Sequence, residues 1–410
     1  MSQDERRGLG GWPGARRRHP VGWALVRGLM AGSLVAGVGG LAALDRLAGA
    51  PEPSPAALAA ASGPDGASTG ATGSGATGSG ATGGPGTGTP VACDPDALIR
   101  AITLANGRQG DTLSLASGCT YTLTANQGGN GLPPIAQRIV VNGNGATITR
   151  AAGADPFRFF DVSLGGDLTL NDVTLTNGLA FPARDGGAIV IRRGGTAELN
   201  RSTLAGNRSD FFGGAIQNGG SLRISDSTVT GNSSDGGGGI ENFARMVVEH
   251  TTVTGNHAVG VGGGIALGIR ATASISDSTI SHNVSDGVNM LAGGGLNIGP
   301  AATITIIGSS IADNTSGGPA GGLIDDHATV NLRDTEVTGN HASGVGGGLV
   351  NEGGTLALAN TRVSDNSSAV APGGIFTDVP NVAVDVRSTI TGNRPTNCAG
   401  SPAAAPRCFG

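Results

Sequence analysis

The stretch GGAIQNGGSLRISDSTVTGN, Gly213 to Asn232, contains the two sequence elements that decide the fold. The first element is Gly-Gly-Ala-Ile and the second is Val-Thr-Gly-Asn. Between them, apolar and polar residues alternate from Leu222 to Ile224. A period of two indicates a β-strand rather than a helix. Glycine, asparagine, aspartate and serine separate the apolar segments, which is typical of tight turns.

Both elements recur along the chain and keep in step. An aliphatic residue, two further residues and an asparagine end at eight positions: Asn207, Asn232, Asn256, Asn283, Asn314, Asn340, Asn366 and Asn393. A Gly-[Gly/Ala]-[Ile/Leu] element ends at Ile189, Ile216, Ile240, Ile265, Leu296, Leu323, Leu349 and Ile375. Successive spacings run from 24 to 31 residues, and both series lengthen to 31 at the same place. They therefore mark one repeating structural unit.

A unit of this length holds roughly three short strands and cannot bury its apolar side alone. Units stacked about 4.8 Å apart would form three parallel sheets around one continuous core. We therefore expect an all-β protein, a right-handed parallel β-helix with three sheets and 24–31 residues per coil. The repeat asparagines are expected to hydrogen-bond from coil to coil as a structural ladder. A line of ligand-binding amides is the alternative interpretation.

The chain divides into three regions. Residues 1–50 combine an arginine-rich start with an uncharged stretch from Gly28 to Leu44, which predicts an export signal, either cleaved or retained as a single-pass anchor. Residues 51–90 are rich in Pro, Ala, Gly, Ser and Thr and predict a disordered linker. Residues 91–410 form the expected β-helix. This order predicts an extracellular or cell-envelope protein that meets a membrane only through its N-terminal segment.

The ends of the β-helix are expected to be closed by a helix and by two disulfides. Asp94 or Asp96 would cap a helix ending near Asn106 that covers the first coil. Its apolar residues suit one buried face: Leu98, Ile99, Ile102 and Leu104. The four cysteines fit no CxxC spacing and, in an exported protein, predict two local disulfides. The expected pairs are Cys93 with Cys119 and Cys398 with Cys408.

Charge excludes several functions. The sequence contains no lysine, and all 25 basic residues are arginine, so chemistry that needs a side-chain amine is excluded. From Val91 onward, 25 acidic residues outnumber 18 arginines, which argues against a nucleic-acid partner. The histidines that flank the repeat asparagines are expected to lie too many coils apart to share a metal ion. We therefore expect neither a metal nor another cofactor.

The repeat resembles that of a known family. Gly213 to Ile216 alternating with Val229 to Asn232 is similar to the polymorphic outer membrane protein repeat, which uses Gly-Gly-Ala-[Ile/Leu/Val] and Phe-x-x-Asn. Here Val, Ile or Leu replaces that Phe. The segments 94–124 and 142–148 also resemble secreted bacterial proteins of the pectin-lyase-like superfamily. Over residues 93–400, the resemblance implies a right-handed β-helix. Because the superfamily contains pectate lyases and polygalacturonases, it also implies a polysaccharide-cleaving enzyme as an alternative.

The best local candidate for catalysis is Asp325-Asp326-His327. Its paired carboxylates resemble one polygalacturonase motif, but the Gly-His-Gly and Arg-x-Lys companions of that motif are missing. We expect these residues to extend a solvent-facing turn instead. Ile298 and Asn351 are expected on either side of Asp325 in adjacent coils, which leaves the turn without a second acid.

Aromatic side chains, the usual platforms for sugars, are scarce at 3% of the sequence. Phe159-Phe160 and Phe211-Phe212 are expected to pack in the core and at its ends, and stacking on a sugar is the alternative. The sequence thus favours a non-catalytic, surface-displayed or secreted β-helix for adhesion or polymer binding. Its expected partner is an extracellular polysaccharide or a host or matrix polymer. The alternative is a polysaccharide lyase or glycoside hydrolase, which three or more convergent carboxylates on adjacent coils would favour.

Overall fold

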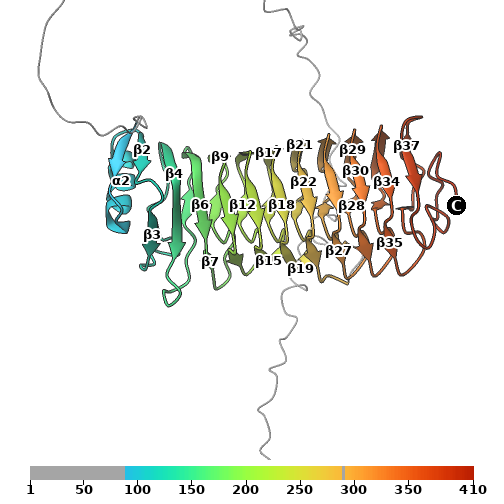
Figure 1. The fold of residues 1–410 in the computed structure, drawn as a ribbon, viewed down its shortest axis with the longest axis horizontal. Helices are drawn as coiled ribbons and strands as arrows, with labels where there is room; N and C mark the ends of the chain where they lie inside the picture. Colours follow the sequence, from blue (N-terminus) through green and yellow to red (C-terminus); the bar gives the residue numbers. More distant parts are fainter. Residues whose placement is uncertain (1–87, 289–290) are drawn as a thin grey trace, which may run out of the picture. The chain divides into compact units, whose positions relative to one another are not determined.

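A computed structural model describes residues 88–288 and 291–410 (Figure 1). The expected export signal and residues 51–87 of the expected linker lie outside the described residues. The first strand, β1, begins at Thr89, two residues before the start that we expected at Val91. Among the described residues, no helix is long and apolar enough to span a membrane.

Short parallel strands stack into about 11 turns of a three-sheet β-solenoid, which confirms the predicted fold class. The nine-stranded sheet contains β5 (Phe160–Val162), β8 (Ile189–Ile191), β12 (Ile216–Asn218), β16 (Ile240–Asn242), β20 (Ile265–Leu267), β24 (Leu296–Ile298), β28 (Leu323–Asp326), β32 (Leu349–Glu352) and β36 (Ile375–Thr377). The eight-stranded sheet contains β7 (Leu179–Ala180), β11 (Arg208–Ser209), β15 (Ser233–Gly236), β19 (His257–Val261), β23 (Val284–Ser285), β27 (Thr315–Ser316), β31 (His341–Ala342) and β35 (Ser367–Ser368).

The third sheet, which we call the wide sheet, has 21 strands in two parallel rows. Two long strands run through both rows and join them: β4 (Arg138–Arg150) and β6 (Asp167–Thr176). The first row adds β1 (Thr89–Val91), β2 (Asp111–Leu115), β9 (Thr196–Asn200), β13 (Ser221–Ser225), β17 (Arg245–Glu249), β21 (Thr272–Ser276), β25 (Thr303–Ile307), β29 (Thr329–Arg333), β33 (Thr355–Ala359) and β37 (Val382–Val384). The second row adds β3 (Thr120–Leu123), β10 (Thr203–Ala205), β14 (Thr228–Thr230), β18 (Thr252–Thr254), β22 (Thr279–Ser281), β26 (Ser310–Ala312), β30 (Glu336–Thr338), β34 (Arg362–Ser364) and β38 (Thr389–Thr391).

Alternation along each strand builds the core. In β13, Leu222 and Ile224 are buried while Arg223 between them is exposed. The same inward positions in the other coils carry apolar residues, mostly Leu, Ile or Val, so their side chains form one continuous apolar core. A one-residue slip would turn this whole set outward, and the buried face therefore fixes the register.

Helix α2 (Pro95–Gly107) lies at one end of the stack, and the C-terminus lies at the other (Figure 1). Asp94 caps the helix by accepting hydrogen bonds from the backbone N–H groups of Asp96 and Ala97. The buried residues of the helix are Leu98, Ile102 and Ala105. Both expected cysteine pairs are disulfide-bonded, Cys93 to Cys119 beside this helix and Cys398 to Cys408 at the far end.

The repeat asparagines form a buried hydrogen-bond chain at the turn between the second row and the eight-stranded sheet. Each asparagine donates two hydrogen bonds, from its side-chain amide and from its backbone N–H, to the side-chain oxygen of the asparagine in the next coil. Asn256 donates to Asn283 Oδ1 from Nδ2 and from its backbone nitrogen, each at 3.0 Å. The second Nδ2 hydrogen goes to the carbonyl of Val229, at 3.0 Å. These amides are used within the protein and are closed to solvent.

The longest coil keeps this register. Asn283 and Asn314 are 31 residues apart, yet Asn283 Nδ2 still donates to Asn314 Oδ1 at 3.0 Å. The next strand, β24, still pairs in register with β20. The extra residues are therefore accommodated between β23 and β24, in the connection from the eight-stranded to the nine-stranded sheet.

Candidate functional site

The turn from the nine-stranded sheet into the wide sheet forms one line of residues along the solenoid, which we call the corner row. Its backbone N–H groups donate to the preceding coil, as from Phe243 to the Asn218 carbonyl at 2.8 Å and from Gly268 to the Asn242 carbonyl at 2.9 Å. This register aligns one residue per coil: Ser163, Arg192, Gly219, Phe243, Gly268, Gly299, Asp326, Glu352 and Asp378. The row thus carries arginine near one end and carboxylates near the other.

A groove of about 420 Å³ follows the corner row across the coils of β8, β12 and β16. Its lining is rich in glycine, with Gly194, Gly195, Gly219 and Gly220. Arg193 follows β8 and Phe243 follows β16, so these two side chains belong to the first and the third of the coils that the groove crosses. Phe243 is 39% exposed. The groove therefore offers a glycine-rich surface with a guanidinium group at one end and an aromatic ring at the other.

Phe243 belongs to an aromatic cluster beside the groove. Its ring meets Phe212 edge to face at 5.4 Å, and Phe212 lies 6.4 Å from Phe211. Our expectation that Phe211 packs in the core is wrong, since that side chain is 42% exposed. The same expectation is confirmed for Phe159 and Phe160, which are fully buried. The difference arises because Phe211 follows a short strand in a loop, whereas Phe160 points inward from β5.

Opposite charges gather next to the groove. Arg192 donates two hydrogen bonds to Asp161, at 2.8 and 3.1 Å. Arg158 is 3% exposed, and burial, followed by repulsion from Arg192, lowers its pKa to about 10. Burial also raises the pKa of Asp185. Burial raises the pKa of Glu241 to about 8, and Asp185 adds to the shift, so Glu241 is protonated at neutral pH.

The structure corrects one expectation about Asp325-Asp326-His327. Asp325 does not face solvent, because it is fully buried and accepts a hydrogen bond from the Ala328 N–H at 2.6 Å. Burial raises its pKa to about 6. Ile298 and Asn351 do flank it in adjacent coils, as expected. Asp325 points inward because residues alternate along β28, and the neighbouring Gly354 leaves room for its carboxylate.

The next residue in the same strand lies in a different environment. Asp326 bonds to His327 Nδ1 at 2.7 Å, and this bond raises the pKa of His327. Asp326 pairs in register with Glu352, and the following coil places Asp378 next in the corner row. We missed both Glu352 and Asp378. The signal was in the sequence, since the three acids are spaced by 26 residues, the spacing of the repeat itself there.

We call Asp326, His327, Glu352 and Asp378 the acidic cluster. Neighbouring coils lie about 4.8 Å apart, so its three carboxylates occupy successive steps of one edge. Burial, followed by the charges of Asp326 and Asp378, raises the pKa of Glu352 to about 7. Glu352 can therefore hold or release a proton near neutral pH. No group of three or more His, Cys, Asp or Glu residues in the described part of the chain could hold a metal ion.

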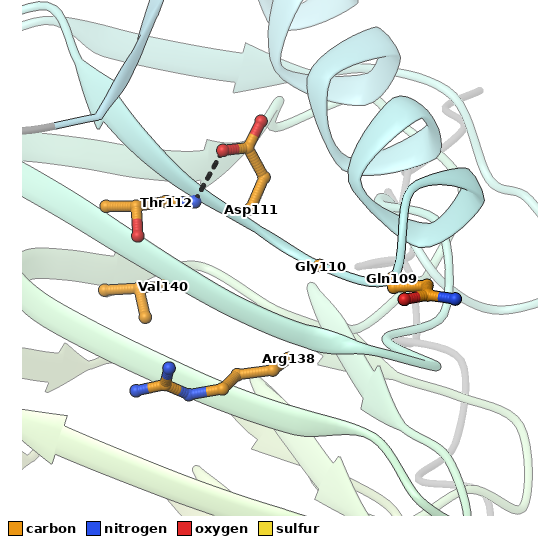
Figure 2. Close-up of a pocket in the computed structure, with 6 residues that line it drawn as sticks. All are labelled: Gln109, Gly110, Asp111, Thr112, Arg138 and Val140. Carbon is orange, nitrogen blue, oxygen red and sulfur yellow. Dashed lines mark hydrogen bonds between the residues drawn. The ribbon is translucent and has the colours of Figure 1, made fainter.

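Other sequence candidates do not converge. His257 hydrogen-bonds to Asp286 at 2.8 Å, and His341 hydrogen-bonds to Ser367 at 3.0 Å. The two histidines lie three coils apart in the eight-stranded sheet. A smaller hollow of about 180 Å³ lies near α2, where Figure 2 shows Asp111 and Arg138 pointing in different directions. Asp111 accepts a hydrogen bond from the Thr112 N–H at 2.7 Å, and Arg138 lies 3.6 Å from Asp167. Its charged groups are thus already paired.

The fold and its corner row define a parallel three-sheet β-solenoid with an open groove. No protein-family model and no curated protein matches this sequence. Among solved structures, the solenoid is similar to the A-modules of two mannuronan C-5 epimerases from Azotobacter vinelandii, AlgE6 and AlgE4. Both are 14% identical and cover 76% of this chain and 95% of the module, with TM-scores of 0.39 and 0.41. A pectate lyase, Pel9A, is 15% identical and covers 78% of this chain and 82% of its own, with a TM-score of 0.34.

Proposed function

We propose that this chain is an exported polymer-binding solenoid that holds a polysaccharide in the groove along its corner row. The observation that carries this proposal is the groove itself, a glycine-rich surface with Arg193 at one end and Phe243 at the other. Ligand sites combine apolar and aromatic walls with a few placed polar groups. The groove crosses three coils, about 10 Å between the outer strands, which suits successive units of an extended chain.

Phe243 is the residue on which sugar binding should depend most. Fully burying a phenylalanine side chain contributes about 1.5–3 kcal/mol, so covering the 39% of Phe243 that is exposed should contribute roughly 0.6–1.2 kcal/mol. Phe243→Ala in the full-length protein should therefore weaken binding about 3- to 7-fold. Phe409→Ala, which removes an 81% exposed ring at the C-terminal end, is the matched control.

The measurement is a titration of the full-length protein against a panel of neutral and uronate-containing polysaccharides. We expect at least one to bind, Phe243→Ala to weaken that binding, and Phe409→Ala to leave it unchanged. Equal weakening by both variants, or no binding across the panel, would remove the proposal.

A second candidate function is hydrolysis of the bound polymer at the acidic cluster. It rests on one observation, the near-neutral pKa of Glu352 between two further carboxylates in register. Pairs of carboxyl groups about 5–9 Å apart perform acid–base glycoside cleavage, and one or two coil steps give such separations. New reducing ends that appear with the wild type and disappear with Glu352→Gln would support hydrolysis. Their absence with every polymer that binds would leave binding as the function.

A further inference from the structure

The second row of the wide sheet carries two in-register columns of side chains, all of them threonine or serine except one alanine, which we call the threonine array. The first column is Thr120, Thr147, Thr174, Thr203, Thr228, Thr252 and Thr279. The second, two residues further along each strand, is Thr122, Thr149, Thr176, Ala205, Thr230, Thr254 and Ser281. Seven consecutive coils therefore repeat the same pair of positions, and no charged residue occurs among them.

The array lies over the apolar core and is partly exposed, except at Ser281, which is buried. Between the two columns, every strand buries an apolar residue: Tyr121, Ile148, Leu175, Leu204, Val229, Val253 and Ile280. In β14, Val229 is buried while Thr228 and Thr230 on either side are partly exposed. Since parallel pairing holds each strand to its neighbours, the outward side chains keep a fixed spacing.

In the first column, Thr120 is exposed and the other six threonines are partly exposed. Their hydroxyl groups form no hydrogen bond to another residue in the described part of the chain. In the second column, Thr149 and Thr254 do bond within the protein, to Thr176 and Asn177 and to Ser281 respectively. Threonine is stiff about χ1, so its hydroxyl and methyl hold one arrangement more firmly than a serine or lysine would.

The spacing of the array fits ordered water. Two oxygens that bond to one tetrahedral water, each at about 2.75 Å, lie about 4.5 Å apart. Neighbouring threonines in a column are separated by the coil step of about 4.8 Å. Across the array, positions two residues apart along a strand are separated by about 6.6 Å. One water can therefore bridge two neighbouring threonines of a column, and the array repeats such positions in two dimensions.

We propose that the threonine array is an ice-binding surface. Its ligand is the water lattice of an ice crystal, held by regular hydroxyl and methyl groups. The array lies on the second row of the wide sheet, whereas the corner row joins the first row to the nine-stranded sheet. The proposal therefore goes beyond polymer binding and does not depend on it.

Strand propensity alone does not account for the pattern. Threonine suits the outer face of any strand. Yet the corresponding column of the first row is interrupted by Ser221 and Arg245. The first column of the array also ends sharply, since Ser310, Glu336 and Arg362 follow Thr279. The uncharged array is thus confined to one set of coils.

The test measures thermal hysteresis and inhibition of ice recrystallisation with the full-length protein. Thr228→Tyr places a bulky ring at the centre of the array, and we expect it to abolish most of both effects. Thr329→Tyr is the matched control, because Thr329 lies in a threonine column of the first row, outside the array. Circular dichroism verifies that each variant keeps its strands.

Wild-type protein that neither separates freezing from melting temperature nor inhibits recrystallisation would overturn the proposal. Equal activity of Thr228→Tyr and the wild type would do the same. Polysaccharide binding serves as a separate readout, since Thr228→Tyr should leave it unchanged and Phe243→Ala should leave ice activity unchanged. Failure of either function is therefore distinguishable from failure of the other.

Discussion

At the scale of single residues, burial raises the pKa of two carboxyl groups. Asp325 and Glu241 are both buried carboxyl groups, and each has one oxygen without a partner among the described residues. Asp325 stands in register beside Asn351, whose side-chain oxygen is also unpartnered. Two acceptors side by side are satisfied when one of them is protonated, because the proton supplies the missing donor. The raised pKa of Asp325 agrees with that arrangement.

These buried acids predict how stability depends on pH. The folded chain holds their protons up to a pH of about 6 for Asp325 and about 8 for Glu241, above their ordinary pKa values of 3.8 and 4.5. The free energy of unfolding should therefore fall as pH rises from about 4 to about 8. Glu241→Gln should remove up to about 4 kcal/mol of this fall. Glu336→Gln, at an exposed strand position, is the control.

Urea unfolding at pH 5 and pH 8 measures the effect. A wild type that is equally stable at both values, or a Glu336→Gln variant that flattens the profile as much as Glu241→Gln, would contradict the prediction.

The residues of the site could be predicted only in part. Asp326 and His327 stood out because a paired acid beside a histidine is unusual in this chain. Glu352 and Asp378 are each a single acid among glycine, valine and proline. Their alignment with Asp326 becomes visible only when the coils are compared at the corner row. Phe243 could not be identified from the sequence as an exposed residue. It is exposed because β16 ends at Asn242 and places Phe243 in the turn, and that boundary is not visible in the repeat.

At the scale of elements, the turns are stabilised by side-chain hydrogen bonds of their own. At this turn, the asparagine side chains satisfy the backbone N–H of the preceding asparagine and a carbonyl such as that of Val229. Asn283 alone accepts two hydrogen bonds from Asn256 and donates to Val253 and Asn314. A buried group that loses its partner costs about 1–3 kcal/mol.

Asn283→Ala should therefore lower the free energy of unfolding by at least about 3 kcal/mol. Asn331→Ala, on the outer face of β29, should change it by less than about 0.5 kcal/mol. Chemical denaturation of both variants makes the comparison, and equal stabilities would show that the asparagine chain contributes little.

Element type was predicted well from the sequence, and the faces of the elements less well. Period-two alternation identified the strands because each has one face on the core. The helix was also correct, but Leu104 is 53% exposed and Ala105 is buried instead. The helical period places residue 105 on the same face as Leu98 and Ile102. Leu104 lies off that face, so it is exposed although its side chain is larger and more apolar than that of Ala105.

At the scale of the whole solenoid, each coil contacts only its neighbours, so stability is local along the stack. The Cys93–Cys119 disulfide joins the segment between β1 and α2 to the turn between β2 and β3. Without it, the first coils should fray while the central coils keep their protection. Replacing both cysteines by serine should therefore speed hydrogen exchange in α2 and β1 but leave β17 to β25 unchanged.

Mass spectrometry of exchange along the chain resolves the two regions. The corresponding variant of Cys398 and Cys408 is the matched control, since it should act only on the last coils. A uniform rise in exchange across all coils, with either variant, would mean that the solenoid unfolds as a single unit and would contradict the prediction.

The 31-residue coil has a consequence for protein engineering. Its extra residues are accommodated between β23 and β24 while both neighbouring strands keep their register. A foreign peptide inserted after Ser285 would therefore be displayed on the flank of the solenoid, away from both the groove and the threonine array. The remaining coils also connect the eight-stranded sheet to the nine-stranded sheet. Peptides inserted in successive coils would therefore be displayed about 4.8 Å apart, so the solenoid could set the spacing between epitopes.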